Sequence, residues 1–419
     1  MVKEIIEKRF LILLSTLVFL SSRPITQTNA AELDDLNQQL SELQDRITQL
    51  EANEKTENAA LPENLKWLEN VKISGDLRYR HDHTDLELES SGSVKWLNGS
   101  DRDRIRARLM FDAIINDDWD VGLRIASGSS RTPNSTNQDL EDAFSSKEIW
   151  LDLAYFNWHP AEEERLNVFG GKMKNPFYKV GSNELIWDSD LNPEGLAAQY
   201  VWTLSDTDQL FLNGSGFWVD ESSLDVDTSL WGTQAYWKHT ISNPDYVLAG
   251  ASYYDYGNLQ GRSALSSTWS SASIFFGNTS SGGLYRYDYN ILEAFGEYVC
   301  EFSGMPTAIF SSWVTNNAAG SSENTGWLIG TKLSKAEDPS SWEFSYDYRE
   351  VDADAVVGGF IESDYLGSFT NSRGHKFGLK YQLAKNIQTV LTYYHLEDTS
   401  SSVGNLDYRR IMADLVFKF

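Results

Sequence analysis

Cysteine and long apolar runs are almost missing from this 419-residue sequence. The single cysteine, Cys300, excludes an internal disulfide framework and a cysteine-rich metal site. No apolar run reaches the roughly 20 residues that a membrane-spanning helix needs, and the mean hydropathy is −0.42, so a helical-bundle membrane protein is excluded. The net charge of −26 argues against nucleic acid as a partner, because both molecules would be negative.

Signals for catalysis and for metal binding are also sparse. Six histidines are scattered along the chain, and only His81 and His83 share spacing and strand parity. No glycine-rich phosphate loop follows a strand and opens a helix, and no serine-centred nucleophile elbow is present. The sequence therefore predicts neither an enzyme nor a bound metal or cofactor.

The first 30 residues have the three parts of a secretory signal peptide. Lys3, Lys8 and Arg9 form a basic start, residues 10–20 are apolar, and Thr28-Asn29-Ala30 supplies small residues for cleavage. An uncleaved anchor is the alternative, but an apolar core of about eleven residues is too short to span a bilayer. We expect secretion and removal of residues 1–30.

Residues 31–51 show a heptad pattern, and residues 52–70 form a polar linker. The apolar positions are spaced alternately by three and four, at Leu33, Leu36, Leu40, Leu43, Ile47 and Leu50. A short motif of trimeric coiled coils is also matched, by Arg46, Ile47, Leu50 and Glu51. Because an isolated helix of this length is marginal in water, we expect a periplasmic coiled coil that assembles a homotrimer. A single amphipathic helix lying on another surface is the alternative.

From residue 71 to the end of the chain, apolar residues repeat with the period of two that is typical of β-strands. The last segment is the clearest, because one parity is apolar at Ile411, Ala413, Leu415, Phe417 and Phe419. The other parity is mainly polar and includes Arg410 and Asp414. The terminal Phe419 resembles the C-terminal signal by which the barrel assembly machinery recognises outer-membrane proteins.

About sixteen such segments follow one another. They lie near residues 71–80, 104–113, 119–125, 148–158, 165–173, 196–204, 208–218, 229–239, 245–256, 286–302, 305–316, 325–335, 341–351, 374–384, 387–396 and 408–419. Short connections alternate with long ones, and the long ones lie near 83–101, 128–147, 174–195, 219–228, 257–285, 317–324, 352–373 and 397–407. This alternation is typical of membrane barrels with tight turns at one end and larger loops at the other.

Lipid offers no partners for backbone N–H and C=O groups, so a spanning sheet must close on itself. The predicted fold class is therefore an all-β transmembrane barrel of about 16 antiparallel strands over residues 71–419. We expect it in the outer-membrane lipid of a Gram-negative bacterium, with both chain ends in the periplasm.

Charged side chains dominate the polar parity of the first three predicted strands. The arginines there are Arg78, Arg80, Arg104, Arg106, Arg108 and Arg124. Such a face cannot pack as a dry core, so it predicts a water-filled interior. The third long loop, residues 174–195, carries Glu184, Asp188, Asp190 and Glu194. This order of parts predicts a constriction where an arginine wall faces an acidic loop. The alternative is a solvated wall whose charges only keep the interior wet.

Three runs resemble the bacterial putative-porin family. Residues 71–80 resemble its opening strand, residues 102–109 its second strand, and Gly171-Lys172-Met173-Lys174-Asn175-Pro176 its Gly-Lys-Met-x-Asn-Pro segment. The order and spacing agree over about residues 60 to 419. The resemblance implies a trimeric outer-membrane channel, and it implies no particular substrate.

The expected function is the passive diffusion of small hydrophilic solutes through a water-filled channel. A solute-selective porin for phosphate or sugar is an alternative, and Trp150, Phe156 and Trp158 are the only hint of an aromatic surface for sugar. A further alternative is a structural tether that acts through the coiled coil.

Overall fold

The computed structural model describes residues 63–90, 93–128, 132–221, 226–268, 273–399 and 405–419. The chain divides into two units, and the second, Trp67–Phe419, contains every strand of this described part. The predicted signal peptide, the predicted coiled coil and residues 52–62 lie outside the described residues. The end of the predicted linker forms a short 3-10 helix, η1 (Glu63–Asn70).

Sixteen long strands in the described residues account for the period-two segments. They are β1 (Val71–Ser90), β2 (Ser93–Asn116), β3 (Trp119–Ser127), β5 (Ile149–Trp158), β6 (Leu166–Lys172), β7 (Glu194–Thr203), β8 (Asp208–Asp220), β9 (Thr228–Ser242), β10 (Asp245–Gly257), β13 (Tyr289–Phe302), β14 (Met305–Asn316), β15 (Thr325–Ser334), β16 (Trp342–Val351), β17 (Ser372–Ala384), β18 (Ile387–Asp398) and β19 (Asn405–Lys418). The connections contain β4 (Gln138–Asp139), β11 (Ser280–Ser281), β12 (Leu284–Tyr285), η2 (Val180–Ser182) and η3 (Leu265–Thr268). Within the described ranges, no helix is long and apolar enough to cross a membrane.

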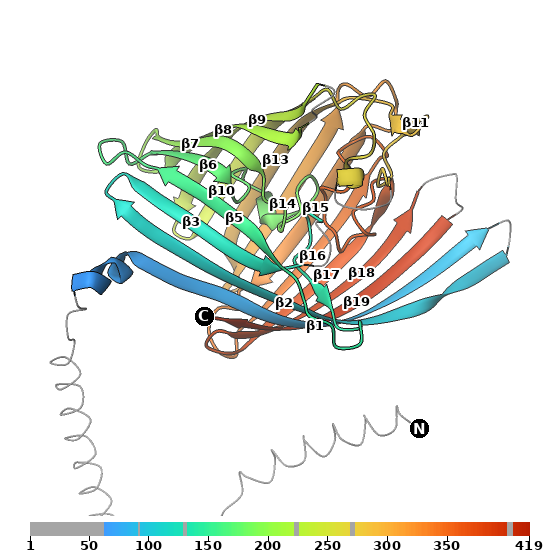
Figure 1. Cartoon of the computed structure of the whole chain (residues 1–419), viewed down its shortest axis with the longest axis horizontal. Helices are drawn as coiled ribbons and strands as arrows, with labels where there is room; N and C mark the ends of the chain where they lie inside the picture. The colour runs from blue at the N-terminus through green and yellow to red at the C-terminus, as the bar shows by residue number, and fades with distance from the viewer. Residues whose placement is uncertain (1–62, 91–92, 129–131, 222–225, 269–272, 400–404) are drawn as a thin grey trace, which may run out of the picture. The chain divides into compact units, whose positions relative to one another are not determined.

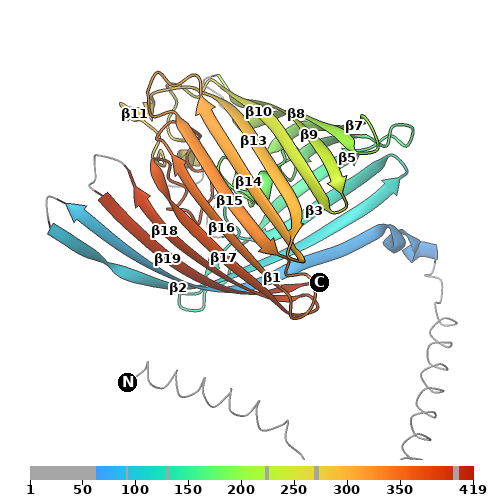
Figure 2. The same ribbon diagram turned by 180° about the vertical axis from the view of Figure 1, so that it is seen from behind.

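The long strands form one closed antiparallel sheet. Each pairs with the next long strand along the chain, and the last pairs with the first. The register of this seam runs from Asp76 opposite Lys418 to Glu89 opposite Asn405. The strands can be followed around the barrel in Figure 1 and, from behind, in Figure 2. The predicted sixteen-stranded barrel is confirmed.

The outer surface of the barrel is apolar. On β19, Ile411 is 42 % exposed whereas the next residue, Met412, is 3 % exposed. Large exposed apolar residues recur at the same outward parity on strands around the wall, for example at Leu123, Trp313, Ile329 and Leu391. An exposed apolar band on a closed barrel is the surface that lipid covers. The predicted parity of the last strand is confirmed.

The predicted alternation of connections is confirmed, with one exception. Short turns such as 117–118, 243–244, 303–304 and 385–386 lie at one end of the barrel, which we name the short-turn end. Ser303 and Gly304 both have positive φ, at 51° and 75°, which is the conformation of a tight two-residue hairpin.

The exception is the segment 83–101, for which the predicted long loop is wrong. β1 and β2 pair from Val71 opposite Ala113 to Ser90 opposite Ser93, so the segment extends both strands. Its beginning, from His83 to Asp85, is polar at every position, so the apolar parity of the preceding residues is interrupted there. Backbone pairing does not need an apolar face, and the alternation that resumes at Leu86 and Leu88 is too short to predict a strand by itself.

A charge on the outer wall should destabilise the barrel. Leu391 is 44 % exposed and lies opposite Leu379 on the next strand. We expect Leu391→Arg to lower the free energy of unfolding in lipid vesicles by about 2–4 kcal/mol, because an arginine in mid-bilayer lacks water. The control is Ala161→Arg, which places the same charge in an exposed short turn and should change little. Equal stability of the two variants would contradict a lipid-facing wall.

Candidate functional site: the barrel interior

Two long loops turn inward and pack against the barrel wall. Loop 173–193 and loop 352–371 are joined by the backbone hydrogen bond from Asp188 N to Phe360 O, at 2.8 Å. Together with inward side chains of the wall they form an apolar cluster, whose members include Phe177, Leu185, Trp187, Val356, Phe360, Ile361, Tyr254, Ile291, Val314 and Leu328. The arginines predicted a water-filled interior, but apolar side chains largely fill the side from β8 to β15, where Glu293 and Glu297 are buried among them.

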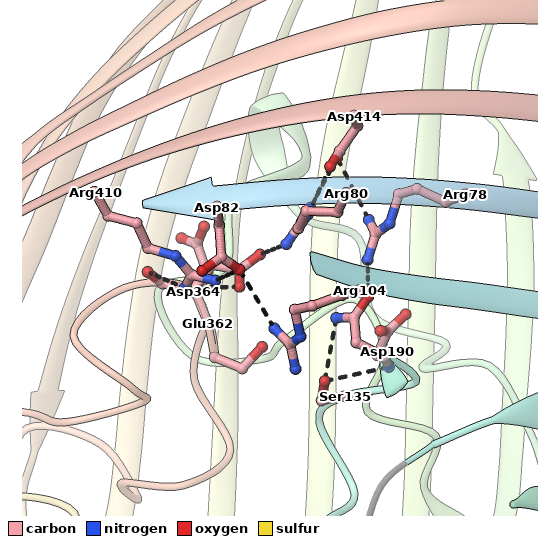
Figure 3. A network of polar contacts seen from close by, with 12 residues as sticks. Arg78, Arg80, Asp82, Arg104, Ser135, Asp190, Glu362, Asp364, Arg410 and Asp414 are labelled. Carbon is pink, nitrogen blue, oxygen red and sulfur yellow. Dashed lines mark hydrogen bonds and ion pairs between the residues drawn. The ribbon is translucent and has the colours of Figure 1, made fainter. Parts of the chain in front are cut away.

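The other side of the interior carries buried ion pairs around the seam between β1 and β19 (Figure 3). Asp364, from loop 352–371, accepts hydrogen bonds from Arg80 on β1 at 2.7 Å and Arg410 on β19 at 3.0 Å. Arg80 also donates to Asp414 on β19 at 2.6 Å, and Arg410 donates to Asp82 on β1 at 2.9 Å. Side chains from the first strand, the last strand and a loop thus meet in one network.

The six predicted pore-lining arginines lie on one wall, and each contacts an oxygen acceptor. Arg78 donates to Asn137 and Arg104 donates to Asp139, both in the connection 128–148. The carboxylate of Asp76 accepts hydrogen bonds from both Arg106 and Arg108. Arg124 donates to Asp152 on β5.

The four predicted acids of the third long loop occupy three different environments. Asp190 forms an ion pair with Arg108 at 3.2 Å, so this part of the loop touches the arginine wall directly. Asp188 accepts from the backbone N of Ser363, and Glu184 accepts from Ser189.

The environments of Asp188 and Asp190 shift their pKa values in opposite directions. Burial raises the pKa of Asp188 well above its usual range, and Glu184 and Asp190 add to this effect. Burial opposes ionisation of Asp190 too, but the charges of Arg106 and Arg108 lower its pKa.

Glu194, the fourth of these acids, is the first residue of β7. It pairs with Lys172 at 2.8 Å and is largely exposed. The structure therefore brings Asp190 to the arginines, places Asp188 and Glu184 against loop 352–371, and leaves Glu194 apart.

No role was predicted from the sequence for Glu362 and Asp364 of loop 352–371. Glu362 is buried and binds Arg349, Lys376 at 2.6 Å and the hydroxyl of Tyr394 at 2.6 Å. Burial opposes its ionisation, but the charges of Lys376 and Arg349 lower the pKa of Glu362 to about 2. Burial likewise opposes ionisation of Asp364, and the neighbouring arginines hold its pKa well below the usual range. An isolated acid in a loop has no periodicity that could single it out.

The remaining predicted residues can be placed briefly. Phe419 extends the seam, because Gly75 N donates to its carbonyl oxygen at 2.9 Å and its own N–H donates to Gly75 O at 3.1 Å. A Cβ at position 75 would lie 2.7 Å from the Phe419 ring, so the glycine makes room for it. Arg46, Ile47, Leu50 and Glu51 lie outside the described residues.

Of the three predicted aromatic residues, Trp150 lines the interior, where it borders a cavity of about 590 Å³ together with Trp187 and Phe360. Phe156 and Trp158 do not join it there. A register shift between Arg124 and Ile125 changes the facing of β5. The rings of Phe156 and Trp158 lie 5.6 Å and 6.2 Å from that of Trp119, on the outer parity of the wall. Among the described residues, no group of three His, Cys, Asp or Glu side chains could hold a metal ion.

Comparison with known proteins identifies the family. The family described as putative porin matches residues 91–292 and 295–419. The chain belongs to the putative-porin family. It is thus an outer-membrane porin, and its family and fold are those of channels rather than enzymes.

Solved structures resemble this porin in fold alone. OprB of Pseudomonas putida has 10 % sequence identity and a TM-score of 0.53, over 84 % of this chain and 96 % of OprB. A mutant porin of Rhodopseudomonas blastica has 13 % identity and a TM-score of 0.43, over 83 % of this chain and 100 % of that one. No curated protein matches the sequence.

Removing the Glu362 carboxylate should destabilise the porin in a pH-dependent way. Glu362→Gln leaves Arg349 and Lys376 without their shared acid, so we expect a loss of about 3–5 kcal/mol at pH 7. Because folding lowers the pKa of Glu362, its ionised carboxylate stabilises the fold fully above the ordinary pKa of 4.5. This stabilisation is lost as the pH falls toward about 2. The thermal midpoints of the wild type and the variant, measured in detergent, should therefore converge over that range.

The control is Glu397→Gln, which removes a carboxylate whose partner, Arg373, is half-exposed. An exposed pair contributes only about 0–1 kcal/mol, so this variant should stay close to the wild type at every pH. A gap between the wild type and Glu362→Gln that persists at pH 2 would contradict the pairing of Glu362.

Proposed function

We propose that this porin allows small hydrophilic solutes to diffuse passively across the outer membrane, through a route narrowed by its inward loops. The observation that carries the proposal is the division of the interior, in which one side is an apolar packing of loops 173–193 and 352–371. Polar groups line the other side, along β1, β2 and β3. A hydrated solute can replace water molecules of its hydration shell by contacts with these groups. We therefore assign the route to the arginine side.

The constriction belongs to this proposal. Arg78, Arg80, Arg104, Arg106, Arg108 and Arg124 would line the route, and loop 173–193 would narrow it through Asp190. Support comes from the direct contact of Asp190 with Arg108 and from its hydrogen bond to Thr136 Oγ1 at 2.9 Å. These contacts hold the loop against the wall, so the width of the route would be fixed. We assign Glu184 and Asp188 to the packing between the loops and Glu194 to the outer end of β7.

The two ends of the chain complete the proposal. Residues 1–30 would direct secretion, and residues 31–51 would form a periplasmic coiled coil. Arg46, Ile47, Leu50 and Glu51 would specify a homotrimer. Phe419 would serve as the signal for the barrel assembly machinery, which is compatible with its exposed side chain at the end of the seam.

Transport by the purified porin tests the function. In planar bilayers we expect stepwise conductance, and in liposome swelling we expect rates that fall smoothly as sugars increase in size. A rate that saturates with one sugar would contradict passive diffusion, and the absence of conductance would contradict the channel.

The charge of Asp190 should influence ion selectivity. Asp190→Asn removes a negative charge beside Arg106 and Arg108, so the channel should prefer anions more strongly than the wild type. One unit charge at about 4 Å in water is worth about 1 kcal/mol, so we expect the anion-to-cation permeability ratio to rise by up to about fivefold. Reversal potentials in a salt gradient measure this ratio.

Asp206→Asn is the matched control for selectivity, because Asp206 is exposed in the short turn 204–207. It makes the same chemical change outside the barrel interior, and its permeability ratio should remain that of the wild type. The same ratio in Asp190→Asn and the wild type would contradict a route past Asp190.

A further inference from the structure

A cavity of about 320 Å³ lies inside the barrel near the short-turn end, where β1 begins and β19 ends. We name it the inner-mouth cavity. Its charged lining residues are Arg106, Arg108, Arg124, Lys174, Lys418, Asp76 and Asp112. Five cationic side chains thus face two carboxylates, and the hydroxyl-bearing Tyr155 also contributes to the lining.

Much of the donor capacity in this cavity is unused. Asp76 engages Nε and Nη2 of Arg106 and Nε of Arg108. Asp190 engages Nη1 of Arg108, and Arg124 uses its Nε atom for Asp152. A guanidinium group has five N–H donors, so each arginine keeps further donors. In the described part of the chain, Lys174 forms no hydrogen bond or ion pair, and its side chain is accessible to solvent.

The backbone around Lys174 is held firmly on both sides. Met173 is buried, and its N–H donates to Pro193 O at 2.9 Å. On the other side, Asn175 accepts from Phe177 N at 3.0 Å, and Pro176 O accepts from Gln199 at 2.7 Å. Lys174 therefore projects from a fixed turn of loop 173–193 into the lining of the inner-mouth cavity.

The electrostatics of the inner-mouth cavity favour a negative ligand. Partial burial lowers the pKa of Lys174, and the nearby charge of Arg124 lowers it further, while Asp112 opposes this effect. An anion beside Lys174 would offset the repulsion between these cations. Guanidinium groups and ammonium groups together are typical ligands of oxyanions, because several charged donors can meet several oxygens.

We propose that the inner-mouth cavity binds a small tetrahedral oxyanion of the phosphate or sulfate type, with Lys174 as its principal ligand. Arg106, Arg108 and Arg124 supply the other donors, and Asp76 keeps the first two arginines in place. The five cationic groups of the cavity outnumber the two lining carboxylates and the two further partners, Asp152 and Asp190, by one, so the net charge is positive and favours such an anion. This proposal rests on the proposed channel, because the cavity lies on the arginine side of the route. It adds that oxyanions would bind within the route while other small solutes pass through it.

Calorimetric titration of the full-length porin in detergent tests this binding. Sodium phosphate and sodium sulfate are titrated at pH 7 into the wild type, Lys174→Gln and Lys385→Gln, with chloride at the same ionic strength as reference. We expect saturable binding of phosphate and sulfate to the wild type. A hydrogen bond from a charged donor makes a difference of about tenfold in affinity, so Lys174→Gln should bind about tenfold more weakly.

Lys385→Gln is the matched control, since Lys385 is exposed in the short turn 385–386 at the same end of the barrel. It loses the same charge outside the cavity and should bind as the wild type does. Equal weakening in both variants would overturn the proposal, as would phosphate binding no tighter than chloride. The loss of Lys174 breaks no ion pair of the described residues, and unchanged thermal midpoints would show that the variant is folded.

Planar-bilayer recordings separate this proposal from the proposed function. Phosphate added at constant ionic strength should reduce the wild-type chloride current, and the reduction should be about tenfold less sensitive to phosphate in Lys174→Gln. A conducting channel that phosphate does not affect would overturn the oxyanion site and leave the channel standing. Phosphate binding by calorimetry without any conductance would overturn the channel and leave the site standing.

Discussion

The pairing of β1 with β19 is the constraint on which the rest of the structure depends. Lipid cannot satisfy backbone N–H and C=O groups, so a sheet in a membrane must have no free edge. In this porin the two ends of the sheet are joined twice, by the backbone ladder and by the side chains of Arg80, Asp414 and Arg410 (Figure 3). Asp364 holds two of these arginines from within the barrel.

The same network links closure to the interior. Loop 352–371 reaches the seam through Asp364 and reaches β16 and β17 through Glu362, which binds Arg349 and Lys376. Its apolar residues pack against loop 173–193. Buried charged groups on one side and packed apolar groups on the other thus fix loops 173–193 and 352–371. A fixed loop can define the width of the proposed route. The function proposed for the arginine side follows from this division.

Local patterns predicted much of the fold, whereas long-range contacts decided what the sequence did not predict. The parity of β19, the alternation of turns and loops, and the shared face of the arginines are all properties of neighbouring residues. The pairing of Arg80 with Asp364 joins residues 284 positions apart, and no periodicity marks it. The strand pairing of segment 83–101 and the outward facing of Phe156 were missed because backbone pairing and a register shift determine them.

Disulfide formation across the seam tests the closed barrel most directly. Tyr79 and Leu415 lie opposite each other on β1 and β19, and opposed Cα atoms of antiparallel strands are within the range of a disulfide. With Cys300→Ser as background, Tyr79→Cys combined with Leu415→Cys should crosslink in outer-membrane vesicles. Tyr79→Cys combined with Asp414→Cys should not, because those side chains point to opposite faces. No crosslink in the first pair, or equal crosslinking in both, would contradict closure through these strands.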